Sequence, residues 1–173
     1  KPAWKVPTPG HWNGGVLATA GDLVFQGRID RRFNAYDAGS GRLLWSFKTE
    51  APVLAPPITY SVGGRQYVTV LAGMSSSASA YGPLMQRFNI DYRTQARRVL
   101  TFALDGRGTL PPAPVVVARA VEDSAFRADP ARALRAEGMF GRSCAICHGV
   151  HAMAAGGAPD LRSSVVPLNP AAF

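Results

Sequence analysis

Short runs of β-branched and aromatic residues, cut by glycine-rich turns, fill the chain from Gly14 to about Leu104. Each turn contains Gly or Asp, which adopt the backbone angles that tight turns require. Strands at this spacing, with almost no helical pattern between them, predict a mainly β fold: a sandwich, a barrel or a propeller. The runs are residues 15–18, 23–26, 42–47 and 66–71, and the turns are residues 21–22, 37–41 and 62–64.

A different pattern follows this β region. Residues 74–89 are first small and polar and then ambiguous, which indicates a long excursion from the sheet before residues 97–106 return to a strand pattern. The proline-rich stretch "GRGTLPPAPVVVARA" then favours an extended, semi-rigid spacer. Beyond it, Asp129 is placed to cap a helix that starts at Pro130. We therefore predict a β domain over 1–105, a linker over 106–120 and a helical domain over 121–173.

Charge and hydropathy narrow the classes of partner. The formal net charge is +8, but the basic residues are scattered, with pairs such as Arg31-Arg32 and Arg97-Arg98 and no dense basic run. This distribution predicts no nucleic-acid partner and suits an acidic protein. No segment reaches the roughly 18 consecutive apolar residues that a transmembrane helix needs. The chain starts with Lys1 and shows no signal peptide, so we expect a processed or truncated piece.

The stretch "SCAICHG" contains both cysteines of the chain, Cys144 and Cys147, with His148 directly after them. A thioredoxin-like redox pair would follow a strand in a βαβ pattern, whereas a helical pattern precedes this one. Zinc bound by these three residues and His151 would need four ligands within eight residues, which is crowded for a structural site. Covalent haem c attachment is the third reading, with two thioethers and an axial histidine. We favour haem, then zinc, then a plain disulfide.

The surroundings of this motif resemble the N-terminal part of class I cytochromes c, with Phe140 before it and Gly149 and Pro159 after it. The resemblance implies that Cys144 and Cys147 form the thioethers and that His148 binds the haem iron. It also implies that the carbonyl of Pro159 accepts the other imidazole N–H, which fixes the orientation of the ring. Such domains use a later methionine as the distal ligand. No methionine follows Pro159, so we expect a truncated cytochrome domain that lacks its sixth ligand.

The β region resembles a known family too. "NAYDAGSGRLLWSFKTE" is similar to the tryptophan-docking motif in the eight-bladed β-propellers of pyrroloquinoline quinone (PQQ) dehydrogenases, where the Trp wedges between blades. Ser40 stands where that family usually has Thr. Residues 11–38 and 55–73 resemble the last blades of these enzymes. The order of propeller, proline linker and Cys-x-x-Cys-His resembles the C-terminal portion of quinohaemoprotein (type II) alcohol dehydrogenases.

The resemblance implies a periplasmic oxidoreductase that oxidises an alcohol with PQQ and Ca²⁺ and passes electrons through haem c to an external acceptor, which is a cytochrome, a copper protein or a quinone. It assigns PQQ contacts to Trp12 and Asn13 and no catalytic residue to this chain. The remaining propeller blades are expected partners, because this piece alone cannot close an eight-bladed ring. Two alternatives stay open: a non-enzymatic c-type cytochrome with a β accessory domain, and a propeller-derived binding module whose cysteine motif is vestigial or holds zinc.

Overall fold

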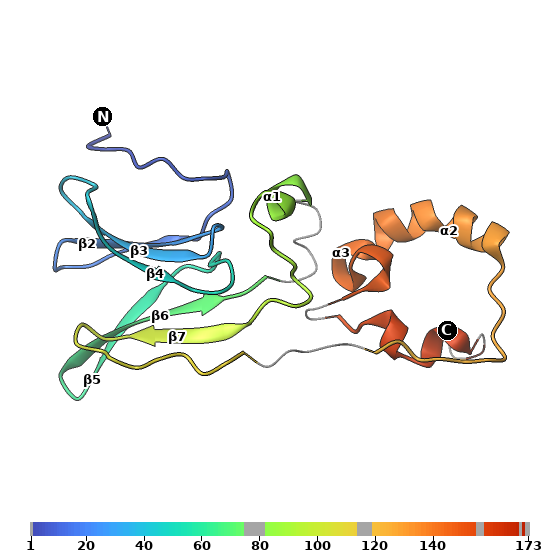
Figure 1. Cartoon of the computed structure of the whole chain (residues 1–173). Helices are drawn as coiled ribbons and strands as arrows, with labels where there is room; N and C mark the ends of the chain where they lie inside the picture. The colour runs from blue at the N-terminus through green and yellow to red at the C-terminus, as the bar shows by residue number, and fades with distance from the viewer. Residues whose placement is uncertain (1, 75–81, 114–118, 155–157, 170, 172–173) are drawn as a thin grey trace. The chain divides into compact units, whose positions relative to one another are not determined.

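The computed structural model describes residues 2–74, 82–113, 119–154, 158–169 and 171. The chain forms two compact units (Figure 1). The first contains Lys1–Met74 and Gln95–Pro114, and the second contains Ser75–Thr94 and Val115–Phe173. The chain therefore passes between the units three times, after Met74, before Gln95 and after Pro114.

Two antiparallel sheets make up the first unit. One has four strands in the order β1-β2-β3-β4, and the other has three in the order β5-β6-β7. The mainly β prediction is confirmed, and each predicted strand run lies within or overlaps an observed strand. Two strands were not predicted, β3 and β5. The strands are β1 (Val16–Ala18), β2 (Leu23–Arg28), β3 (Arg32–Asp37), β4 (Leu43–Lys48), β5 (Ile58–Val62), β6 (Arg65–Ala72) and β7 (Arg98–Phe102).

The turn between β3 and β4 is built by its own side chains. Asp37 Oδ1 accepts hydrogen bonds from the backbone N–H of Ser40 at 2.7 Å and from its hydroxyl at 2.6 Å. These bonds hold the pKa of Asp37 below its usual value, and the bond from the Ser40 hydroxyl has the largest effect. Gly41 has a φ of 74°, and a Cβ there would lie 2.7 Å from the ring of Trp4. Glycine is therefore required both by the backbone and by the indole, whose Nε1 donates to the Ala38 carbonyl at 2.7 Å.

Aromatic side chains join the two sheets. Phe33 of β3 is fully buried, and its ring centroid lies 5.5 Å from that of Phe102 on β7. Trp45 is opposite Ala35 in the sheet register and meets the Phe102 ring edge-on at 5.2 Å. The docking-motif tryptophan thus reaches from its own sheet to the next, as the resemblance to PQQ propellers implied. The buried residues of this core are Phe33, Ala51, Val53, Val68, Val70, Ala72 and Leu100.

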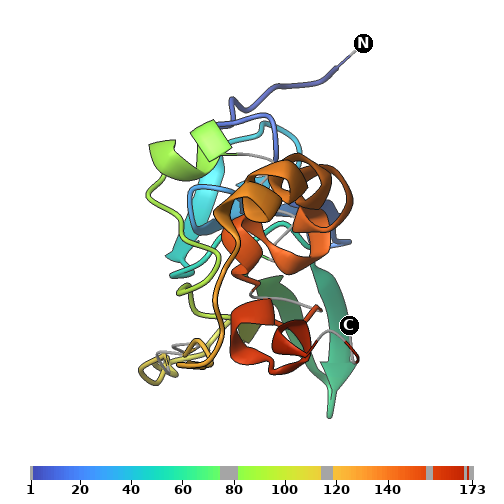
Figure 2. The same cartoon turned by 90° about the vertical axis from the view of Figure 1, so that its right-hand side faces the viewer.

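The second unit is helical. Figures 1 and 2 both show the longest helix, α2, on one side of the unit and the segment at 161–168 on the other. None of the described helices is long and apolar enough to span a membrane. Among the described residues of this unit, the elements are α1 (Gly82–Arg87), α2 (Pro130–Ser143), α3 (Ala145–His148) and short 3-10 helices at Val150–Ala152, Leu161–Ser163 and Val166–Leu168.

The boundaries of these units differ from the predicted division in two respects. Residues 82–94, which the sequence places inside the predicted β domain 1–105, belong to the second unit, where Tyr92 bonds the segment after α3. Residues 106–113 of the predicted linker belong to the first unit, whereas residues 119–120 belong to the second. The predicted excursion at 74–89 contains α1, while residues 75–81 lie outside the described part. In the predicted linker, residues 106–113 carry no helix or strand. Pro114 and the rest of 114–118 also lie outside the description.

Candidate functional site

Helix α2 leads the chain to the first cysteine. Asp129 Oδ1 accepts hydrogen bonds from the backbone N–H groups of the first two non-proline residues of the helix, at 2.9 and 3.0 Å. Pro130, which has no N–H to leave unpaired, is the first helical residue. The predicted helix start is confirmed, and a cap of this kind stabilises a helix by about 1 kcal/mol. The helix ends where Cys144 begins the motif.

Cys144, Cys147 and His148 belong to one turn of the chain. The backbone N–H of His148 donates to the carbonyl of Cys144 at 2.9 Å. Residues three and four positions apart around such a turn are neighbours, with Cβ atoms about 5–6 Å apart in a regular helix. Neither cysteine forms a disulfide; Cys144 is half-buried and Cys147 is exposed. Two thiols and one imidazole are therefore presented by a single short segment.

Pro159 orients the imidazole of His148. The Nδ1 atom lies 2.9 Å from the Pro159 carbonyl oxygen. A carbonyl oxygen only accepts hydrogen bonds, so Nδ1 carries the proton. In the neutral ring the other nitrogen, Nε2, then holds the lone pair and is the atom that can bind a metal. These are the two residues that the resemblance to cytochromes c pairs; their roles toward a haem remain predictions.

The four-ligand zinc arrangement is not formed. Within the described part of the chain, no three or more His, Cys, Asp and Glu side chains are grouped so as to hold a metal ion. His151, the fourth member of the zinc set, is exposed on the turn that follows α3. A haem brings its own iron and macrocyclic nitrogens, so it needs only the thiols and one imidazole nitrogen from this turn. The residues present fit a haem better than a zinc ion.

The turn after α3 has an unusual backbone. Gly149, His151 and Ala152 all have positive φ angles, of 79°, 56° and 60°. A Cβ on Gly149 would lie 2.3 Å from the Met153 carbonyl oxygen and 2.8 Å from the Tyr92 hydroxyl. Glycine is the residue that satisfies both the angle and the space.

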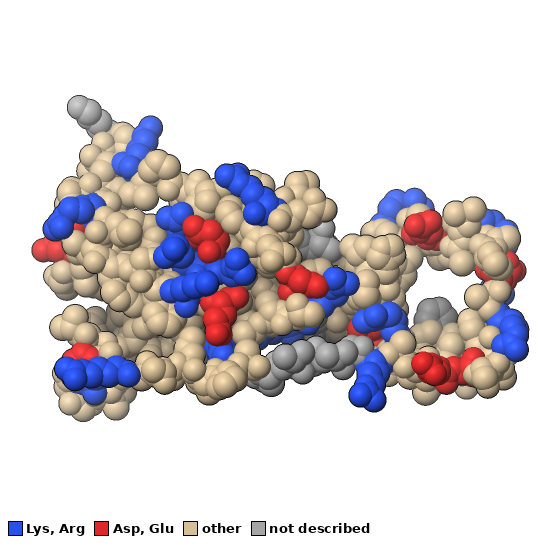
Figure 3. All heavy atoms as spheres, in the orientation of Figure 1, with Lys and Arg blue, Asp and Glu red and all other residues tan. Residues whose placement is uncertain are grey.

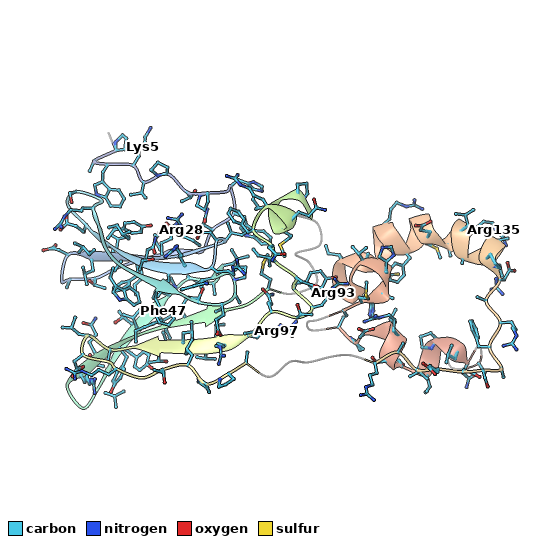
Figure 4. All side chains as sticks on the ribbon, viewed as in Figure 1. Lys5, Arg28, Phe47, Arg93, Arg97 and Arg135 are labelled. Atoms are coloured by element: carbon cyan, nitrogen blue, oxygen red, sulfur yellow. The ribbon has the colours of Figure 1, made fainter. Side chains whose placement is uncertain are left out.

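Tyr92 and Arg93 hold this turn from a distant part of the sequence. The Tyr92 hydroxyl donates to the Met153 carbonyl at 3.1 Å, and Arg93 Nη1 donates to the Met153 Sδ at 3.2 Å. Arg93 also forms a two-pronged ion pair with Asp91, and its guanidinium holds the pKa of Asp91 below the usual value. Figure 4 labels Arg93, whose side chain lies beside this turn. No sequence signal links residues that are 60 and 61 positions apart.

A second ion pair fixes the backbone just after Pro159. Arg162 Nη2 lies 2.7 Å from Asp160 Oδ2, and this guanidinium lowers the pKa of Asp160. The Arg162 carbonyl accepts a hydrogen bond from the N–H of Val121 at 2.6 Å. The carbonyl that orients His148 is thus followed directly by an anchored segment.

A hollow of about 690 Å³ lies beside the motif. The α2 side chains along it are not buried by any other described element, so this face of the helix is open. The two thiols are not part of its lining. The lining consists of Ala133, Ala136, Glu137, Phe140, Gly141, Arg142, Ala145, Ile146, Val150, His151 and Ala152.

In the first unit, the predicted PQQ contacts lie on a turn before β1. Asn13 Nδ2 donates to the Gly10 carbonyl at 2.8 Å, and its Oδ1 accepts from the Ile29 N–H at 3.3 Å. The Asn13 side chain therefore holds this turn together. Trp12 is half-buried on the same turn. Trp12 and Asn13 are consecutive residues of this turn, and their role toward PQQ stays a prediction.

Several acidic residues of the first unit have structural partners. Asp30 pairs with Arg28 at 2.8 Å, and Asp37 organises its turn. Asp105 pairs with Arg65. On the face shown in Figure 3, acidic side chains lie among the basic ones. That this chain contributes no catalytic residue stays a prediction.

Known proteins similar to this chain match it across both units. Residues 3–68 match the family described as PQQ: glucose/ethanol/alcohol dehydrogenase, beta-propeller domain. The chain is 41% identical over 167 residues to the quinohemoprotein alcohol dehydrogenase ADH IIB of Pseudomonas putida, covering 95% of this chain and 24% of the relative. It is 37% identical over 173 residues to the dehydrogenase subunit of the quinone alcohol dehydrogenase of Gluconobacter oxydans, covering 99% and 22%.

Solved structures that resemble this chain are also quinohemoprotein alcohol dehydrogenases. The quinohemoprotein alcohol dehydrogenase ADHIIG of Pseudomonas putida matches with a TM-score of 0.65 and 38% identity, covering 94% of this chain and 23% of that one. The enzyme of Comamonas testosteroni matches with a TM-score of 0.56 and 31% identity. The chain thus spans about a quarter or less of the length of the relatives it matches. Over 95% of its length it is homologous to the quinohaemoprotein alcohol dehydrogenases, and its residues 3–68 match their PQQ β-propeller domain.

Proposed function

We propose that this chain is part of a periplasmic oxidoreductase that oxidises alcohols with PQQ and passes the electrons through a covalently bound haem c to an external acceptor. The second unit is then the beginning of a cytochrome c domain. The observation that carries the proposal is the hydrogen bond between His148 and Pro159, next to two cysteines that form no disulfide. The homology to quinohaemoprotein alcohol dehydrogenases supports it.

Three side chains would hold the haem. The thiols of Cys144 and Cys147 would hold it through two thioether bonds. Nε2 of His148 would bind the iron, because Nδ1 is committed to Pro159. When bound, the haem supplies one-electron chemistry. The contribution of the chain is to fix the thiols and the imidazole on one turn, so that attachment and ligation use the same segment.

The first unit would contribute to the quinone site through Trp12 and Asn13. The bonds of Asn13 to Gly10 and Ile29 stiffen the turn that carries the half-buried Trp12. A rigid turn suits a residue that contacts a cofactor, because little conformational freedom is then lost on binding. Calcium ligands and the catalytic base are proposed to come from other parts of the complete protein.

The proposed compartment is the bacterial periplasm, as the resemblance to quinohaemoprotein alcohol dehydrogenases implies. Export of the complete protein is tested by fractionation: the haem-bearing protein is expected in the periplasmic fraction, and its confinement to the cytoplasm would contradict this part of the proposal.

One experiment on the complete protein separates the enzyme from its rivals. Reduced-minus-oxidised spectra and in-gel haem staining after denaturation report covalent haem. Reduction of a dye by a primary alcohol, with PQQ and Ca²⁺ added, reports the dehydrogenase. The proposal predicts both signals. Haem without alcohol-dependent reduction would indicate a simple electron carrier, and neither signal would indicate a binding module.

A further inference from the structure

Two residues far from the cysteine motif in sequence contact the turn that follows it. Tyr92 and Arg93 lie in residues 82–94, between β6 and β7 in the chain, and this segment belongs to the second unit. Tyr92 is only 9% exposed, and its hydroxyl bonds the backbone of Met153. Arg93 bonds the sulfur of the same methionine. Two consecutive side chains thus donate hydrogen bonds to one residue of the turn.

The gripped turn is strained. His151 and Ala152 have left-handed φ angles of 56° and 60°, which residues with a Cβ rarely adopt. Strain of this kind persists only where the surrounding contacts over-determine the backbone. The bond from Tyr92 to the Met153 carbonyl is such a contact. The closeness of the Tyr92 hydroxyl to the position of a Cβ on Gly149 shows how tightly the tyrosine packs on the turn.

This turn starts the loop that orients His148. The loop leaves the histidine at Gly149 and returns its Pro159 carbonyl to the histidine Nδ1 at 2.9 Å. Holding Met153 fixes the backbone five residues after His148, so fewer conformations compete with the one in which Pro159 accepts this hydrogen bond. On the far side of Pro159, the Asp160–Arg162 pair holds the chain.

We propose that Tyr92 and Arg93 are positioning residues for the axial histidine: they hold the turn at 149–153 and thereby maintain the hydrogen bond between His148 and Pro159. This inference rests on the proposed haem c function. A carbonyl that accepts a hydrogen bond from the Nδ1–H group makes the ligating nitrogen of the imidazole more basic, and a more basic ligand stabilises the oxidised iron. Tyr92 and Arg93 therefore keep the reduction potential of the haem low.

The test uses the complete, haem-loaded protein. The variant Tyr92→Phe removes one hydroxyl and keeps the ring. The matched control is Tyr60→Phe, which removes the hydroxyl bonded to Thr69 on the exposed part of the first unit. Midpoint potentials are measured by spectroelectrochemical titration. We expect a more positive potential for Tyr92→Phe than for wild type, and no shift for Tyr60→Phe.

A second variant covers the case in which Tyr92→Phe does not accumulate with haem. Arg93→Met removes the donor to the Met153 sulfur, and it is expected to shift the potential in the same positive direction by a smaller amount, because sulfur is a weak acceptor. Unchanged potentials in every haem-loaded variant would overturn the inference. Absence of covalent haem from the wild-type protein would instead overturn the proposed function.

Discussion

The Nδ1 atom of His148 lies 2.9 Å from the carbonyl oxygen of Pro159, 11 residues further along the chain. This bond sets the tautomer of the imidazole and leaves Nε2 as the metal-binding nitrogen. It joins the two ends of a loop that Tyr92 and Arg93 hold near its middle.

Replacing both cysteines removes covalent haem. The double variant Cys144→Ala, Cys147→Ala is expected to lose all haem staining on denaturing gels, because no thiol remains to form a thioether. His148→Ala keeps the stain but changes the spectrum, since the iron loses its proposed axial ligand. His151→Ala is the matched control and keeps both stain and spectrum. Covalent haem in the double variant would contradict the attachment site.

Gly149→Ala prevents the turn from forming. Its Cβ would meet the Met153 carbonyl oxygen at 2.3 Å, and its φ of 79° is unfavourable for alanine. We expect at least a tenfold lower yield of haem-loaded protein, measured by absorbance per mole of chain. The control is Gly141→Ala in α2, where a Cβ meets nothing within 4 Å. That change is expected to stabilise the helix by about 1 kcal/mol. Normal haem loading of Gly149→Ala would show that the turn does not matter.

Acid weakens the anchor after Pro159. The guanidinium of Arg162 lowers the folded-state pKa of Asp160 below its ordinary value of about 3.9. The stabilisation is therefore fully present above that ordinary value and is lost as the pH falls through the lower folded value. Asp160→Asn removes this dependence and makes the haem spectrum less sensitive to pH below about 4. The control Asp105→Asn alters a more exposed pair and leaves the acid titration unchanged. Identical titrations of wild type and Asp160→Asn would contradict the assignment.

The aromatic contact between the sheets supplies stability. Phe33→Ala removes a fully buried ring and is expected to cost about 3–5 kcal/mol. Leu43→Ala, at a position 51% exposed, is the control and is expected to change stability by less than about 0.5 kcal/mol when this surface remains exposed in the complete protein. Calorimetric melting of the complete protein measures both. A large effect of Leu43→Ala would indicate that another blade covers this surface.

Local chemistry was readable from the sequence. The turn at Asp37, Ser40 and Gly41 was predictable because short polar side chains and glycine are the residues that tight turns favour. The start of α2 was predictable because a capping Asp129 is followed by Pro130 at the first helical position.

Other features were hidden from sequence reasoning for physical reasons. Strand β3 was missed because Asn34, only 1% exposed, breaks the apolar alternation at a core position. The grip of Tyr92 and Arg93 on Met153 depends on tertiary packing, and no periodicity relates those positions. For the same reason, the sequence could not assign residues 82–94 to the second unit.

The proposed electron path from alcohol to haem is tested most directly by mixing the complete, PQQ- and Ca²⁺-loaded protein with a primary alcohol and following the haem spectrum in a stopped-flow instrument. Covalently bound haem is expected to become reduced only when alcohol is present. The double variant Cys144→Ala, Cys147→Ala, which is expected to hold no covalent haem, is expected to show no such reduction. Haem that stays oxidised while alcohol is consumed, or a protein without covalent haem, would contradict it.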